Sequence, residues 1–326
     1  MRAWLERVWY GDARGGFLLR PLALLFALAG ALRRWLYRSG RLRSLPSGRP
    51  VVVVGNLSVG GSGKTPLVAW LADALAAAGL RVGIVSRGYG GAGAGPLRVL
   101  ATTDPRLAGD EPVLLARRTA ARVAIGRDRV AAARLVSADV DLILADDGLQ
   151  HYRLARDLEI LVLDGARRYG NGRLLPAGPL REPVARGRRA AFTVVNGGPV
   201  AGEEVAMTLV PVAVVELASG ARAPLASFAG RAVHALAGIG NPARFFATLR
   251  AAGLTVHEHP LPDHAALTPE DVRFDDGLPV LMTEKDAVKC GSFPPAGLYW
   301  LDVAAELPAV DAARILKRLL ALAQGA

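Results

Sequence analysis

The chain is poor in cysteine, in lysine and in aromatic residues, and it lacks a long uninterrupted hydrophobic run. Cys290 is the single cysteine among 326 residues, which excludes an internal disulfide and fits a reducing compartment. No segment has the roughly 18 consecutive apolar residues expected of a membrane-spanning helix, although 52% of all residues are hydrophobic. These absences exclude a disulfide-rich or multi-span membrane protein and predict a globular chain of one or two domains.

Basic residues outnumber acidic residues, and the formal net charge is +11. Such a charge suits an anionic membrane surface, a phosphate-bearing substrate or nucleic acid. The arginines are spread along the chain without the interleaved aromatics of a stacking platform, so no nucleic-acid partner is expected. Because lysine is scarce, its placement is informative: one lies in a glycine-rich loop and two lie together in TEKDAVKC. The lysines are Lys64, Lys285, Lys289 and Lys317.

Residues 1–48 combine an apolar stretch with arginines on both sides. The stretch from Pro21 to Leu32 is too short to span a membrane. A signal peptide is disfavoured because about twenty residues, Glu6 among them, precede the stretch. A helix buried in the core remains an alternative. The preferred interpretation is an interfacial helix, with apolar side chains at headgroup depth and arginines against anionic lipid.

Short apolar runs alternate with helical patterns over residues 49–200. The runs are unbroken Val, Ile and Leu, which is typical of strands buried on both faces of a parallel sheet. After the first run, Leu67, Leu71, Leu75 and Ala78 share a helical face, and Gly79 ends the pattern. We therefore predict an α/β fold with a doubly wound, mostly parallel sheet. The expected strands are 51–54, 81–85, 122–125, 141–145, 158–163 and 191–195.

The chain changes character after about residue 200. Residues 201–226 predict a β-rich linker, and strand and helix patterns resume at about residue 227. The last pattern, DAARILKRLLALA, predicts a closing helix. We expect an N-terminal region at 1–48, a larger domain at 49–200, the linker, and a smaller α/β domain at 227–326.

The segment GNLSVGGSGKTP lies between the first predicted strand and the amphipathic helix. It departs from G-x-x-x-x-G-K-[ST] only where Ser58 replaces the first glycine. Glycines let backbone N–H groups point at phosphate oxygens, the lysine reaches the β- and γ-phosphates, and the threonine hydroxyl can hold Mg²⁺. We predict a P-loop NTPase type of domain that binds ATP and Mg²⁺. The expected nucleotide-binding residues are Ser58, Val59, Gly60, Gly61, Ser62, Gly63, Lys64 and Thr65.

Acidic residues at the end of a predicted strand supply the second part of such a site. In DLILADDGLQ, either Asp146 or Asp147 can hold Mg²⁺, directly or through water. A kinase also needs a carboxylate for the attacking hydroxyl and positive groups around the phosphoryl group. Residue chemistry alone predicts an ATP-using phosphotransferase or an NTPase at a membrane. The candidates for the added groups are Asp110, Glu111, Asp263, His264, Arg87, Arg173 and Arg181.

Several motifs together resemble those of the tetraacyldisaccharide 4′-kinase family. They are GNLSVGGSGKTP, SRGYGG, AGDEP, DDGLQHYRLARDLEI, LLPAGPLREP, AGIGNPARFF, PDH and TEKDAVKC, in the family's order from about residue 50 to 290. Ser58 belongs to the family's own loop. The resemblance implies an ATP- and Mg²⁺-dependent transfer of the γ-phosphate to the 4′-hydroxyl of tetraacyldisaccharide 1-phosphate, a lipid A precursor. It also implies a location at the cytoplasmic face of the bacterial inner membrane.

The resemblance further implies roles for individual residues. Asp110 would be the base for the sugar hydroxyl with His264 as its partner, and Lys64 would act on the phosphates. After PDH the family often has a second histidine or an aromatic residue, whereas this chain has AALT, so the packing of that loop is expected to differ. The expected metal ligands are Thr65, Asp146, Asp147, Glu111 and Gln150, and the expected substrate residues are Arg87, His151 and Arg181.

Together these expectations predict a peripheral lipid kinase whose N-terminal helix lies on anionic lipid. Closure of the smaller domain would bring His264 to Asp110 and exclude water. The alternative is a membrane-tethered P-loop NTPase switch, which shares the loop and the basic helix but needs no base for an acceptor.

Overall fold

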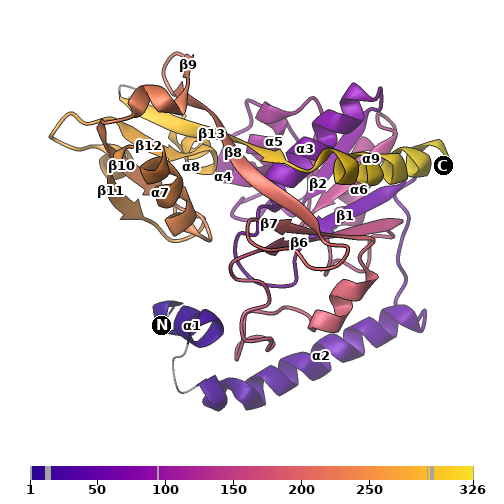
Figure 1. The fold of residues 1–326 in the computed structure, drawn as a ribbon. Coiled ribbons are helices and arrows are strands. Elements are labelled where there is room, and N and C mark those ends of the chain that lie inside the picture. The colour runs from indigo at the N-terminus through magenta and orange to yellow at the C-terminus, as the bar shows by residue number, and fades with distance from the viewer. Residues whose placement is uncertain (1, 12–15, 94, 292, 294–296, 326) are drawn as a thin grey trace.

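The computed structural model describes residues 2–11, 16–93, 95–291, 293 and 297–325. Its larger half is a sheet with helices packed on both faces (Figure 1), which confirms the predicted α/β fold. Each predicted strand of this half forms within one residue of its expected ends, because Val, Ile and Leu suit strands buried on both faces. They are β1 (Val51–Gly55), β2 (Val82–Ser86), β4 (Arg122–Ile125), β5 (Leu142–Asp146), β6 (Leu158–Asp164) and β7 (Phe192–Asn196).

The strand order gathers several motifs at one edge of the sheet. Strands β7, β6, β1, β5, β2 and β4 are parallel neighbours, and the short β3 (Leu97–Val99), which the sequence did not predict, adds an antiparallel edge. Parallel strands end at the same edge, so the segments after β1, β5 and β2 meet there. These segments are the glycine-rich loop, the aspartate pair and SRGYGG. The helices of this half are α3 (Lys64–Ala77), α4 (Pro105–Ala108), α5 (Asp110–Arg118), α6 (Arg129–Ser137) and η2 (Val184–Arg189).

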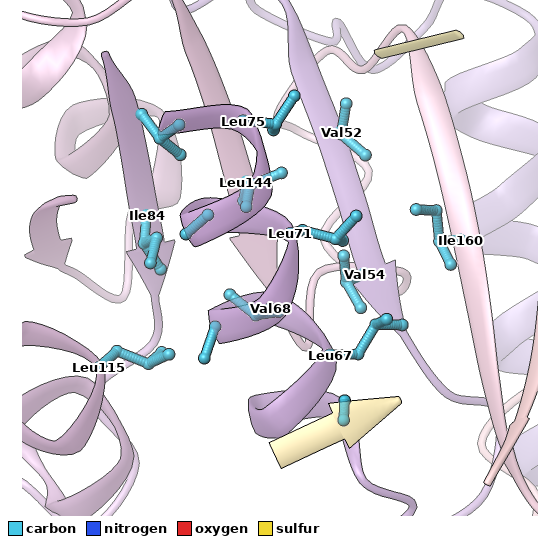
Figure 2. Close-up of a cluster of buried hydrophobic side chains, with 14 of the residues drawn as sticks. Val52, Val54, Leu67, Val68, Leu71, Leu75, Ile84, Leu115, Leu144 and Ile160 are labelled. Atoms are coloured by element: carbon cyan, nitrogen blue, oxygen red, sulfur yellow. The ribbon is translucent and has the colours of Figure 1, made fainter. Parts of the chain in front are cut away.

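Helix α3 anchors the glycine-rich loop to the sheet. Its Leu67, Leu71 and Leu75 are fully buried and point toward the strands, as Figure 2 shows. Full burial of one leucine side chain contributes about 1.5–3 kcal/mol, so this face holds the helix and the loop before it in place. Ala78, expected on the same face, lies beyond the end of the helix and is exposed. Gly79 ends the turn as predicted, with φ of 88°.

The smaller half continues the same sheet. Strand β8 (Val205–Glu216), predicted as part of a linker, starts beside β7 and then pairs antiparallel with β13 (Leu298–Glu306). Both strands therefore run from one half into the other (Figure 1), and in the described part of the chain the sheet has 13 strands. The remaining elements are β9 (Arg222–Ala223), η3 (Leu225–Phe228), β10 (Ala232–Ala237), α7 (Pro242–Ala251), β11 (Thr255–Pro260), η4 (Pro269–Val272), β12 (Val280–Thr283), α8 (Glu284–Ala287) and η5 (Val288–Cys290).

The C-terminal helix α9 (Ala309–Gln324) does not follow the predicted domain boundary. The sequence assigned it to the domain at 227–326, but its Ile315 and Leu319 are fully buried in the core that α3 shares with the larger half. An amphipathic pattern shows that a helix has a buried face and does not show which half covers it. The division into domains otherwise stays a prediction.

Helix α2 (Arg20–Arg38) runs along one side of the molecule, apart from the sheet (Figure 1). It has no buried residue, which excludes the core helix considered from the sequence. One face approaches the larger half through an ion pair between Arg34 and Glu182, with 3.7 Å between Nη1 and Oε1. Its leucines other than the half-buried Leu36 are exposed, and Leu25 is 63% exposed. The helix is preceded by α1 (Arg2–Tyr10) and η1 (Gly16–Leu19).

This segment is long enough to cross a membrane. The prediction from the sequence that it is too short to span was therefore wrong about length. The helical segment Gly16–Arg38 has 23 residues, and an 18-residue window within it has a mean hydropathy of 1.6, which is enough to cross by length and composition. The exclusion counted only the uninterrupted apolar run, whereas arginines near the ends of a helix can reach the interface. Length and composition alone do not separate a spanning helix from an interfacial one.

Candidate active site

The glycine-rich loop leads from β1 into the N-terminus of α3. Gly63 has φ of 89°, and a Cβ on it would lie 2.3 Å from Asn196 Nδ2, so only glycine fits. Asn196 at the end of β7 holds the loop by donating Nδ2 to the Ser62 carbonyl at 3.2 Å. The free N–H groups and positive end of the helix favour an anion at this place.

The first residues of the loop are engaged with another segment. Ser58 forms a β-bridge with Leu180, and the Val59 N–H donates to the Pro179 carbonyl at 2.9 Å. The backbone N–H of Val59 is therefore not directed at a phosphate. The N–H groups that can face a phosphate begin at Gly60, and their contacts with a nucleotide stay a prediction.

Asp147 lies between two cations at the carboxyl end of β5. Its Oδ1 is 3.7 Å from Lys64 Nζ, and its Oδ2 accepts a hydrogen bond from Arg181 at 2.9 Å. Burial opposes its charge, but Lys64 and Arg181 outweigh burial and hold the pKa of Asp147 below its usual range. Its φ of 48° is uncommon for a residue other than glycine, and such strain concentrates at functional sites. Asp147 is therefore ionised and held beside the lysine of the loop.

Asp146 is the last residue of β5 and is only 1% exposed. Its Oδ1 has no hydrogen-bond partner, and burial together with the charges of Glu111 and Asp147 raises its pKa to about 7. A buried carboxylate without a partner is costly, and its oxygens suit Mg²⁺. Within the described residues no group of three or more His, Cys, Asp or Glu is arranged to hold a metal. A cation at Asp146 would therefore take further ligands from Thr65, phosphate or water.

Asp110 and His264 meet although they come from different halves of the molecule. His264 Nδ1 lies 3.1 Å from Asp110 Oδ1 and 3.2 Å from Oδ2. Asp110 begins α5 and is 6% exposed; burial raises its pKa, but His264, Lys285 and Lys289 outweigh burial and lower it to about 2. His264 has φ of 61°, a second uncommon backbone conformation at a predicted site residue.

Lys285 of TEKDAVKC lies at the centre of this cluster. Its Nζ is 3.0 Å from Glu111 Oε1, 3.0 Å from Asp263 Oδ1 and 3.2 Å from His264 Nε2. Burial opposes its charge, but Glu111, Asp110 and Asp263 outweigh burial and raise its pKa above the usual range. Glu111, expected as a metal ligand, is thus bound to a lysine in this structure.

Arg87, Gln150, His151 and Arg181 lie around one cavity of about 1100 Å³, which Lys64, Asp147 and His264 also line, whereas the candidate Arg173 does not line it. Gln150 donates Nε2 to the Asn56 carbonyl at 3.2 Å, so its nitrogen faces the protein. Burial and nearby arginines lower the pKa of His151 to about 4, and its buried Nε2 has no partner.

Two features of the cavity bear on how a substrate enters it. Arg87 and Arg181 both line the cavity. Arg181 is paired with Asp147, whereas Arg87 is exposed and makes no hydrogen bond or ion pair within the described residues. Asp110 and Asp146 are buried and do not line the cavity. A substrate in the cavity therefore reaches either carboxylate only after side chains or loops move.

A model of the tetraacyldisaccharide-1-P 4′-kinase family matches residues 16–322 of the chain. The chain belongs to this family. It is similar to the tetraacyldisaccharide 4′-kinase of Nitrosococcus oceani, with 48% identity over 316 residues that cover 96% of this chain and 93% of the relative. It is 51% identical to that of Xanthomonas campestris pv. campestris over 334 residues, which cover 97% and 95%. The crystal structure of LpxK from Aquifex aeolicus in complex with ATP has a TM-score of 0.77 and 31% identity, and the match covers 93% of this chain and 98% of that one.

Some residues that shape this site in the tetraacyldisaccharide 4′-kinase fold were not predicted. Gly240 of AGIGNPARFF packs on the glycine-rich loop so closely that a Cβ on it would lie 2.2 Å from the Gly61 nitrogen. Its carbonyl accepts a hydrogen bond from Arg167 at 2.8 Å. The scarcity of lysine could have pointed to Lys285. Asn196 ends an ordinary strand, and no local signal marks it.

Proposed function

We propose that this protein transfers the γ-phosphoryl group of ATP to the 4′-hydroxyl of tetraacyldisaccharide 1-phosphate, a lipid A precursor. Family membership supports the reaction, since relatives at about 50% identity over nearly the whole chain carry that activity as their name. ATP as donor is supported by the ATP-bound structure of the similar LpxK. The observation that carries the acceptor chemistry is the Asp110–His264 pair beside the cavity that the glycine-rich loop lines.

Asp110 serves as the base for the attacking hydroxyl. A low pKa makes it a weak base, but phosphoryl transfer has little need of a strong one, because the nucleophile loses its proton late and catalysis rests on positioning. His264 orients the carboxylate through Nδ1. Since Asp110 is nearly buried, the sugar reaches it only when the loop that carries His264 moves with the smaller half.

Lys64 and the loop N–H groups from Gly60 onward bind the phosphates. Lys64 keeps its ammonium near the γ-phosphate and gives up part of its interaction with Asp147, which lies 3.7 Å away. Arg181 holds Asp147 in place meanwhile. These fixed charges stabilise the charge that develops on the transferred group.

Mg²⁺ fits the aspartate pair, because Asp146 Oδ1 and Asp147 Oδ1 are both buried without a hydrogen-bond partner. The residues that would hold it are Asp146, Asp147 and Thr65. When bound there, Mg²⁺ supplies positive charge to the β- and γ-phosphate oxygens. Glu111 joins these ligands only by leaving Lys285, and Gln150 only by turning its oxygen toward the cavity.

The lipid acceptor implies association with a bacterial membrane. We place the protein peripherally at the cytoplasmic face of the inner membrane, where ATP is available. The outward leucines of α2 support this placement, since their apolar side chains can enter the interface while the flanking arginines meet anionic lipid.

The test is transfer of ³²P from labelled ATP to tetraacyldisaccharide 1-phosphate in detergent–lipid micelles. Wild-type protein is expected to give labelled bisphosphorylated lipid, and Asp110→Asn to lower kcat by roughly 10²–10⁴-fold, as removal of a general base does. Asp104→Asn is the matched control, because Asp104 caps α4 with its side chain and asparagine caps equally well.

The outcomes separate the parts of the proposal. Transfer that survives Asp110→Asn keeps the kinase and removes the base. ATP consumption without labelled lipid overturns the lipid kinase and supports a nucleotide switch, whose ATP turnover would not depend on Asp110.

A further inference from the structure

The two lysines of TEKDAVKC contact the Asp110–His264 pair in different ways. Lys285 on α8 touches the imidazole itself, with Nζ 3.2 Å from His264 Nε2. Lys289 on η5 lies 3.6 Å from Asp110 Oδ2 and 2.9 Å from Asp286 Oδ1. Both side chains are nearly buried, with 13% and 12% exposed. The chain has only four lysines, and two of them lie at this pair.

The contacts of Lys285 determine where the hydrogen atoms are. An ammonium group has three N–H donors and no acceptor. Its three hydrogen-bond partners are Glu111, Asp263 and His264 Nε2, so Nε2 must accept with its lone pair. The single hydrogen of the neutral ring is then on Nδ1, which faces both oxygens of Asp110. Lys285 and Asp110 thus select the same tautomer from opposite sides of the ring.

A second proton on His264 would conflict with Lys285. It would place an N–H on Nε2 directly opposite the ammonium, 3.2 Å away. Charge effects act in both directions: burial and Lys285 disfavour the imidazolium, whereas Asp110 and Asp263 favour it, and the balance raises the pKa of His264. Lys285 is therefore the cation that opposes protonation of this ring.

We propose that Lys285 is a positioning residue for the Asp110–His264 pair: it selects the tautomer whose N–H is directed at Asp110, and it opposes the second proton that Asp110 and Asp263 favour. A neutral donor orients the carboxylate without withdrawing as much of its charge as an imidazolium would. Asp110 thereby remains a better acceptor for the hydroxyl proton. The proton cannot pass to His264 while Lys285 occupies Nε2, so Asp110 itself accepts it. The catalytic consequence rests on the proposed function, whereas the assignment of the His264 tautomer does not.

Other groups around the ring bear on its environment. Tyr89 packs on the ring with 4.8 Å between the centroids, and Asp263 Oδ1 lies 3.8 Å from Nε2. Removal of Lys285 leaves these groups in place and removes the cation that opposes the second proton. The groups that face the pair are Asp110 and Glu111 on α5, Asp263 beside His264, Tyr89 after β2, Lys285 on α8 and Lys289 on η5.

The experiment is ¹⁵N NMR of the imidazole nitrogens in full-length protein in detergent micelles, with His264→Asn to assign the signal. In the wild type at mildly alkaline pH, Nε2 is expected to resonate as an unprotonated nitrogen and Nδ1 as an N–H. In Lys285→Met the His264 pKa is expected to rise by on the order of one unit. Lys289→Met is the matched control, because it removes a cation near Asp110 that does not touch the ring, and it should leave the His264 titration close to wild type.

Kinetics supply the second readout. In Lys285→Met, kcat for lipid phosphorylation is expected to fall about tenfold at neutral pH, with the KM for ATP nearly unchanged. It should recover as pH rises through the raised His264 pKa, because the imidazolium then loses its extra proton. A merely structural role would lower kcat equally at every pH.

Several results would overturn the inference. They are a wild-type ring protonated on Nε2 at alkaline pH, an unchanged His264 titration in Lys285→Met, or equal shifts in the two lysine variants. Should Lys285→Met fail to fold, the wild-type spectrum decides alone. The spectra need no lipid substrate, so a wild type that transfers no phosphate to lipid would count against the proposed function and leave this inference to be decided by NMR.

Discussion

Gly240→Ala tests how the smaller half meets the phosphate-binding loop. The added Cβ would lie 2.2 Å from the Gly61 nitrogen and 3.0 Å from its Cα. Both contacts are with backbone atoms, so no side chain can turn aside to make room. Gly240 does not have a positive φ, so alanine itself causes no backbone strain there. The substitution therefore acts through the contact between the two halves.

The size of the effect follows from the overlap. A Cβ essentially never lies within 3.0 Å of another heavy atom, so the two backbones must separate by at least ~0.8 Å. A misplacement of about 1 Å near the reacting groups can cost roughly 10²-fold. We expect kcat/KM for ATP to fall by about tenfold to a hundredfold. The midpoint of thermal unfolding should change little, since separation of the halves relieves the overlap without unfolding either one.

Steady-state kinase assays at varied ATP, with calorimetry of unfolding, measure both expectations. Gly291→Ala is the matched control, because Gly291 also lies in the smaller half, has no positive φ, and would place its Cβ more than 4 Å from every described residue other than its chain neighbours. The reasoning would be refuted if kcat/KM for ATP were the same in Gly240→Ala and Gly291→Ala. Such a result would mean that the contact with Gly61 is not kept in the working enzyme.

Two further predictions concern the metal and the membrane. Mg²⁺ binding to the nucleotide-free protein should release about half a proton at pH 7 and close to one proton at pH 6, and should strengthen as pH rises, because Asp146 has a pKa of about 7 and must ionise first. Calorimetry in buffers of different ionisation enthalpy measures this release, and a release that persists in Asp146→Asn would contradict it. Leu25→Glu with Leu28→Glu, at side chains 63% and 58% exposed, should lower vesicle co-sedimentation at least tenfold, since each buried leucine contributes about 1.5–3 kcal/mol. Val310→Glu, at an apolar side chain of α9 that is 82% exposed, is the control, and equal loss in it would argue against α2 as the contact.

The parallel sheet could be predicted from the sequence because its strands are unbroken runs of Val, Ile and Leu. Such runs have one plausible environment, a sheet covered on both faces, so their ends were correct within a residue. The edge strand β3 carries the exposed Leu97 and Arg98 and resembles a loop in composition. Whether α9 packs on one half or the other depends on contacts between residues far apart in the chain, and no local pattern encodes them.

The motifs of the candidate site could be predicted from the sequence, but the arrangement of their side chains in space could not. Spacing identified the glycine-rich loop, and strand order explains why it lies beside Asp146 and Asp147. The pairing of Asp110 with His264 depended on resemblance to the family, because the two residues are 154 positions apart. The left-handed backbone of Asp147 and His264 could not be foreseen, since neither residue type requires it.

Helix α5 connects the candidate base to the strands that join the two halves. Asp110 begins the helix, and Arg118 at its other end donates to the Val303 carbonyl and to Glu284 Oε2, the latter at 2.8 Å. Val303 lies where the pairing of β13 with β8 shifts register, and a bulge of this kind is where a strand bends.

A nine-residue helix is about 13.5 Å long and stiff. A displacement of β13 at the bulge would therefore be transmitted through α5 to the position of Asp110. Arg118 ties the far end of α5 to β13 and, through Glu284, to the helix α8 that carries Lys285. Under the proposed function, a movement of the smaller half that admits the acceptor to Asp110 would also withdraw His264 from it.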